Sequence, residues 1–221
     1  MRLFSICFVL ALIHVGSAMA QTCPPPGTFV PELKVALSTS AGIPVYSGEL
    51  NRARVNALAG QKGTASGGNV IGLTVSEVEG SVKPQIWSVD MGGGRRCVGL
   101  GRVDGHWRLK DLVVYIASEY PPGACNYARI RQHEDEHVAI NRDTFQRWAP
   151  HMQEALRKAA LTVRPTITST DTGQVAREVS ERLMSALKAP MDAYRAELRT
   201  RNAAIDTSAS YRSVMSRCPS W

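Results

Sequence analysis

Residues 133–137 read His-Glu-Asp-Glu-His, so two histidines stand four positions apart with a glutamate directly after the first. On an α-helix, positions i and i+4 lie one above the other on one face, and the imidazoles of His133 and His137 can therefore reach one metal ion. Glu134 projects beside them, where a carboxylate can take a proton from water at the metal. The spacing predicts a zinc site with two histidine ligands and Glu134 as general base.

The segment around this motif has the pattern of a long amphipathic helix. Its apolar residues recur at intervals of three, four, seven and eight, at Ile130, Val138, Phe145, Trp148, Met152 and Leu156. Glu134 falls on this stripe, where a carboxylate is costly unless it is paired or close to a metal. The alternative is a solvated acidic helix with two incidental histidines, and the position of Glu134 argues against it.

The first 20 residues read as a signal peptide. Arg2 precedes an apolar run over residues 3–16 and a small-x-small site at residues 18–20, and the run is too short to span a bilayer. We therefore expect an exported chain, periplasmic or secreted, with one domain over residues 21–221 and no membrane span after cleavage.

Four cysteines remain in that domain: Cys23, Cys97, Cys125 and Cys218. An even number in an exported chain predicts two disulfides, and three pairings are open. We favour Cys97 with Cys125, which would link the sheet to the start of the motif helix, and Cys23 with Cys218. The rival interpretation, a cysteine metal site, lacks any CxxC spacing.

Charge and composition point to no nucleic acid partner. The formal net charge is +7, but the arginines are scattered and no nucleic-acid-binding signature accompanies them. A protein or peptide substrate is the partner that the motif implies.

The remaining pattern predicts an α+β fold: an antiparallel or mixed sheet in the N-terminal half, followed by two long antiparallel helices, the first carrying HExxH, as in zincins. Strands are expected at residues 33–37, 44–46, 70–78, 86–91, 97–103 and 112–117, with a short helix over 49–58. The motif helix should run from a cap at Asn126 to about residue 163, with a bend at Pro150. A second helix should begin near Asp171 and bend at Pro190, and a short helix should cover 208–217.

Over roughly residues 33–146 the chain resembles a bacterial family of predicted secreted zinc-dependent proteases whose function is otherwise unknown. The matching features are the signal peptide, Tyr46-Ser47-Gly48, a strand with Trp87, then Cys97, and the apolar strand that leads into HExxH. The family's C-terminal region has a Tyr-Asp element and then Thr-x-His-Gly. Here Asp206 matches the aspartate, while the histidine is absent and Tyr211 stands nearest its place. The resemblance implies zinc peptidase activity.

The third zinc ligand is predicted by counting along the two helices. If they pair about a turn at residues 164–170, His133 lies opposite about residue 202, whereas Glu178 and Glu181 fall about 30 Å from the metal. Asp143 would point away from the histidines. Asp206 is ranked first, because it also matches the family's aspartate, and Glu197 second; the alternative role for Asp206 is to cap the last helix.

These residues are compatible with two functions. The first is an exported zinc metallopeptidase, in which Tyr120 or Tyr127 either donates to the oxyanion or only packs. The second is a zinc-bearing binding or structural protein that cuts nothing. Glu134 favours the first, because a structural site has no use for a base.

Overall fold

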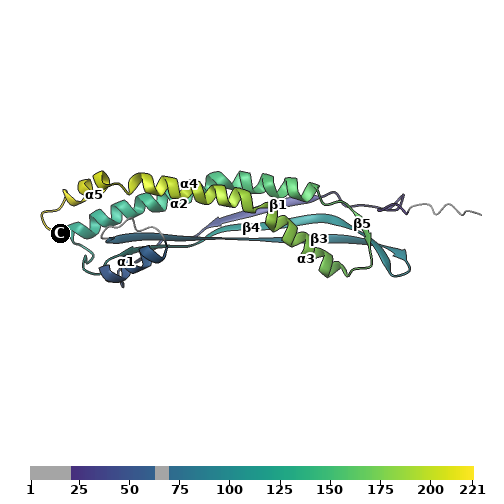
Figure 1. Cartoon of the computed structure of the whole chain (residues 1–221), viewed down its shortest axis with the longest axis horizontal. Helices are drawn as coiled ribbons and strands as arrows, with labels where there is room; N and C mark the ends of the chain where they lie inside the picture. The colour runs from purple at the N-terminus through teal and green to yellow at the C-terminus, as the bar shows by residue number, and fades with distance from the viewer. Residues whose placement is uncertain (1–20, 63–69) are drawn as a thin grey trace, which may run out of the picture.

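The computed structural model describes residues 21–62 and 70–221. The chain is elongated, with a long sheet beneath a layer of helices (Figure 1). Its elements, in chain order, are β1 (Lys34–Ala41), β2 (Val45–Ser47), α1 (Arg52–Gln61), β3 (Gly72–Gly92), β4 (Arg95–Ile116), α2 (Cys125–Leu161), β5 (Thr166–Thr168), α3 (Thr172–Ala186), α4 (Lys188–Ile205) and α5 (Ser208–Met215).

The long strands β3 and β4 form an antiparallel hairpin that runs along the molecule. Three glycines at its turn, Gly92, Gly93 and Gly94, have φ of 76°, 62° and 74°, a region that glycine adopts without strain. The short strands β5, β1 and β2 pair in turn with the other edge of β4. Among the described residues, no strand pairs with the outer edge of β3.

The predicted antiparallel or mixed sheet followed by two long antiparallel helices is wrong. The strand path β1–β4–β2 is parallel, and the expected second helix is two helices, α3 and α4. The chain turns at Leu187, whose N–H bonds to the carbonyl of Met184, and Pro190 has no N–H to continue an α-helical ladder. The α+β class itself stands, and Asp171 caps α3 as expected.

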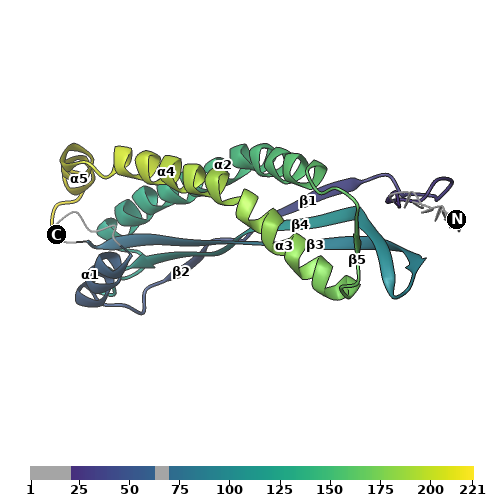
Figure 2. The ribbon, with the colours of Figure 1, turned by 45° about the vertical axis from the view of Figure 1, so that its right-hand side comes forward.

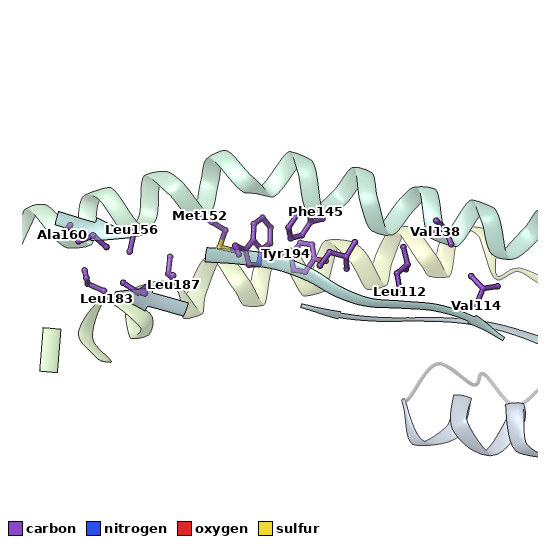
Figure 3. Packing of buried hydrophobic residues seen from close by; sticks show 14 of the residues in the cluster. Leu112, Val114, Val138, Phe145, Met152, Leu156, Ala160, Leu183, Leu187 and Tyr194 are labelled. Carbon is purple, nitrogen blue, oxygen red and sulfur yellow. The ribbon is translucent and has the colours of Figure 1, made fainter. Parts of the chain in front are cut away.

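The core lies between the sheet and α2, and the predicted apolar stripe of α2 faces it. Phe145 stacks on Trp107 of β4 with ring centroids 4.3 Å apart, and Met152 and Leu156 are almost fully buried farther along the helix. Leu183 of α3 and Tyr194 of α4 close the core from the helix side (Figure 3). This packing fixes the orientation of α2 and with it the face on which the motif lies.

Two disulfides are present, but the favoured pairing was wrong. Cys23 bonds Cys97, and Cys125 bonds Cys218, with Cα–Cα distances of 5.4 and 5.9 Å. Cys97 lies near the start of β4 and Cys125 follows its end, so the length of β4, on the order of 60 Å, separates them. Each bond therefore lies near one end of β4, and the hairpin of β3 and β4 runs along most of the molecule (Figure 2).

Disulfides are typical of an oxidising environment, as in exported proteins. The predicted signal peptide at residues 1–20 lies outside the described residues. No helix in residues 21–62 and 70–221 has the length and apolar character needed to cross a membrane.

Candidate metal centre

Two helices bring three metal-ligating side chains together. His133 and His137 lie on the face of α2 that α4 covers, and Asp206 directly follows the last residue of α4. The Oδ1 atom of Asp206 is 3.2 Å from Nε2 of His133 and 3.1 Å from Nε2 of His137. One ligand atom from each residue lies within 4.8 Å of the others, so the three can share one ion.

Asn202 fixes the tautomer of His137. Its Oδ1 lies 2.7 Å from Nδ1 of His137, and its own amide N–H donates to the carbonyl of Leu198. The amide oxygen is therefore the acceptor and Nδ1–H the donor, which leaves Nε2 facing Asp206. Such a partner on the far nitrogen is what orients metal-binding histidines.

The surroundings of His137 and Asp206 favour a protonated, positively charged imidazole beside the carboxylate. Burial alone lowers the pKa of His137, but the hydrogen bond to Asp206 and the nearby charge of Glu134 outweigh it and raise the pKa to about 9. Burial also opposes ionisation of Asp206, yet its hydrogen bonds to His133 and His137 hold its pKa well below the usual range. The site thus favours a positive charge between His137 and Asp206.

The donor set fits a zinc ion. Two neutral imidazole nitrogens and one carboxylate oxygen are one of the ligand sets found in catalytic zinc sites, which leave a fourth position open. The side chain of Asp206 is 28% exposed, whereas both histidines are nearly buried, so the site opens on the Asp206 side. These residues can hold a divalent metal, and their geometry does not by itself select zinc.

Glu134 lies beside this cluster and is not part of it. It is 4% exposed, and its Oε2 accepts a hydrogen bond of 2.8 Å from the hydroxyl of Thr74 on β3. A Cβ at Gly72 would stand 2.5 Å from the other oxygen, so a glycine is needed where β3 passes this carboxylate. Burial raises the pKa of Glu134, which suits a group that takes and returns a proton.

Tyr211 of α5 completes the surroundings of the metal cluster. Its hydroxyl donates to Oδ1 of Asp206 at 2.9 Å, and its ring centroid is 5.5 Å from that of His133. Burial and the charge of Asp206 raise the pKa of this phenol. Tyr211 therefore stays protonated near neutral pH and can donate a hydrogen bond.

Several alternatives from the sequence are now decided. Thr207, not Asp206, caps α5, since its hydroxyl accepts from the N–H of Ser210. Glu197, the second-ranked ligand, accepts from the indole of Trp148 and pairs with Arg147.

Tyr120 and Tyr127, for which an oxyanion role and simple packing were both open, pack against other side chains, and the expected helix cap is absent. The ring of Tyr120 packs against Trp221, and Tyr127 packs against the core. The helix cap expected from Asn126 is absent, because its side chain donates to the carbonyl of Ser220.

The facing residues of the two helices lie about one turn from the positions predicted by counting. His137 was expected opposite residue 198, whereas Asn202 contacts it. The reason is that β5 and α3 intervene between the two helices in place of a simple turn. Asn202, Thr74 and Tyr211 were not predicted as site residues; only the resemblance, through the position of Tyr211, gave a signal for one of them.

A cavity of about 470 Å³ opens beside the metal centre. It lies between residues 73–76 of β3 and the end of α4, and Asn202 and Asp206 line its wall.

Comparisons with known protein families, with curated proteins and with solved structures found no match to this chain.

Proposed function

We propose that this protein is an exported zinc-dependent metallopeptidase. The observation that carries the proposal is a buried carboxylate, Glu134, beside three converging ligands, His133, His137 and Asp206. A closed structural zinc site would instead use four protein ligands and have no need of a buried base. The resemblance of the motif region to secreted zinc-dependent proteases points the same way.

Zinc, when bound, would supply Lewis acidity and lower the pKa of water at the site. His133, His137 and Asp206 would hold it, with Asn202 keeping the Nε2 atom of His137 turned inward. Glu134 would accept a proton at its carboxylate and later return it to the leaving amine. Thr74 would keep the carboxylate in place through its hydrogen bond.

The free edge of β3 supports a peptide as substrate. Residues 73–76 line the cavity beside the metal, and no described strand occupies that edge. An extended peptide can add there as a further strand, with main-chain hydrogen bonds to β3. The hydroxyl of Tyr211, which donates to Asp206 in this structure, would have to turn from that carboxylate to donate to the substrate oxygen that gains charge.

The test is metal content and proteolysis of the mature chain with Glu134→Gln. We expect the variant to keep one zinc per chain and to lose hydrolysis by at least about a hundredfold, the usual scale of general-base catalysis. Glu136→Gln, a change at an exposed glutamate of the same motif, is the matched control and should keep activity.

If the wild type binds zinc and cleaves nothing in a broad peptide mixture, the alternative of a zinc-bearing binding or structural protein replaces the proposal. Equal cleavage by wild type and Glu134→Gln would remove the general-base role.

A further inference from the structure

A second cavity lies along the same strand and helix as the metal centre. It measures about 210 Å³ and is bounded by Val78 and Gly80 of β3 and by α4 as far as Arg195. The first cavity ends at Ser76 of β3 and Leu198 of α4. Two strand positions span about 7 Å and three helical positions about 4.5 Å, so the two cavities follow one another directly along the cleft between β3 and α4.

The second cavity is apolar and small. Its lining consists mainly of Leu37, Trp107, Met152, Met184, Leu187 and Met191. Methionine side chains adapt to varied apolar shapes. Pockets for drug-sized molecules usually measure about 300–1,000 Å³, so this volume suits one large apolar side chain better than a separate ligand.

The indole ring of Trp107 forms part of the wall of this cavity. Trp107 is only 2% exposed, and its Cδ1 lies 3.9 Å from the place where a Cβ on Gly80 would stand. Because Gly80 also lines the cavity and has no side chain, the indole ring forms an apolar wall directly above the strand.

The open edge of β3 connects the two cavities. A peptide that pairs with β3 near Thr74, whose hydroxyl bonds Glu134, reaches Gly80 if it stays extended. Two residues farther along, the hydroxyl of Ser180 on α3 donates to the carbonyl of Val82, so Gly80 lies just before the point where α3 meets the strand. Six strand positions separate Thr74 and Gly80, about 20 Å. Side chains directly opposite one another on paired strands point to the same face, so the peptide residue opposite Gly80 faces this cavity.

We propose that this cavity is a specificity subsite for a large apolar side chain of an extended peptide substrate, about six residues from the bond that is cut. The assignment of this cavity as a substrate subsite rests on the proposed peptidase function. Gly80 is what leaves the subsite empty: a Cβ there would meet nothing nearer than 3.6 Å, so a larger side chain can be introduced.

The test is affinity selection of a displayed library of random peptides on the zinc-loaded Glu134→Gln chain. We expect the selected peptides to carry a large apolar residue, and to bind at least tenfold more weakly when Gly80→Leu is added to that chain. Ser81→Leu is the matched control, since it adds the same side chain on the opposite, exposed face of the strand, and should leave binding unchanged.

Met184→Asp is a second variant for the same test; it places a charge at the rim of the cavity, where the methionine is 36% exposed, and should also weaken binding. Thermal unfolding and zinc content verify that each variant is folded. No selected peptide, no apolar enrichment, or equal binding by both cavity variants and the control would overturn the subsite.

Cleavage of the selected peptides by the wild type separates this inference from the proposed function. If the peptides depend on Gly80 for binding and the wild type leaves them intact, the peptidase proposal fails while the binding site stands. If the wild type cleaves peptides with no apolar preference at that distance, the subsite fails while the peptidase proposal stands.

Discussion

The two halves of α2 bury the same face of the helix but differ in the kind of residue that they bury, polar in the first half and apolar in the second. In the first half the buried positions include His133, Glu134, His137 and Asn141, and in the second half they are mainly apolar, such as Phe145, Met152 and Leu156. Each buried polar group of the first half has a polar partner from another element, whereas the second half packs on the sheet and on α3 and α4. One half of the helix therefore anchors the fold, and the other half holds the site.

Replacing a core residue in the second half of α2 should lower the stability of the fold without affecting metal binding by the first half. Phe145→Ala removes a buried ring that stacks on Trp107, and large-to-small changes of this kind cost about 3–5 kcal/mol of unfolding free energy. We expect this loss in chemical denaturation, with one zinc still bound per folded chain. Loss of zinc from the folded variant would show that the two halves are not separate.

The pH dependence should come from the half that holds the site. In the metal-free protein the pKa of His137 is raised from 6.5 to about 9, so its protonated form adds stability that is complete below about pH 6.5 and disappears as the pH rises through 9. The size is on the order of 3 kcal/mol. Zinc replaces this proton, so at pH 7 its uptake should release about one proton and its affinity should rise toward pH 9.

Denaturation of metal-free protein between pH 6 and 9.5, and calorimetry of zinc binding in buffers of different ionisation enthalpy, measure both effects. His137→Gln is the control and should lose the slope. An unchanged slope in that variant would assign the dependence to another group.

A smaller effect is expected from the residue that orients His137. Asn202→Ala removes the acceptor for Nδ1–H, and loss of such a partner typically weakens metal binding by about 10–100-fold. Competition with a zinc chelator measures the affinity. Thr200→Ala removes a hydroxyl that, among the residues the structure describes, bonds only to the carbonyl of Ala196 on its own helix, and it should bind zinc as the wild type does. Equal affinities for both variants would exclude the orienting role.

The motif half of α2 could be predicted from sequence because its signals are local. The i,i+4 spacing of the histidines and the apolar stripe depend only on helix geometry, and the structure has both on the expected faces. Asp206 could be predicted because a helix count and the family resemblance both pointed to it. The residues that face the histidines nevertheless lie about one helical turn from the counted positions.

The long hairpin was not predicted as such, because the two halves of β3 and of β4 were read as separate strands. In β4 the residues between the two predicted strands alternate charged outward positions, such as Arg108 and Lys110, with buried ones, such as Trp107 and Leu109. The apolar runs on either side dominated the pattern. The disulfide pairing failed for the same reason, because it depends on how far β4 carries the chain before α2 begins.

The most direct test of the central claim is a crystal structure of the zinc-soaked mature protein with anomalous data at the zinc absorption edge. The account predicts one anomalous peak bound by Nε2 of His133, Nε2 of His137 and a carboxylate oxygen of Asp206, at about 2.0–2.2 Å. The fourth position should be free of protein atoms, and Glu134 should remain unbound with its hydrogen bond to Thr74. A peak held by four protein ligands, or one bound directly by Glu134, or no peak between the histidines, would contradict it.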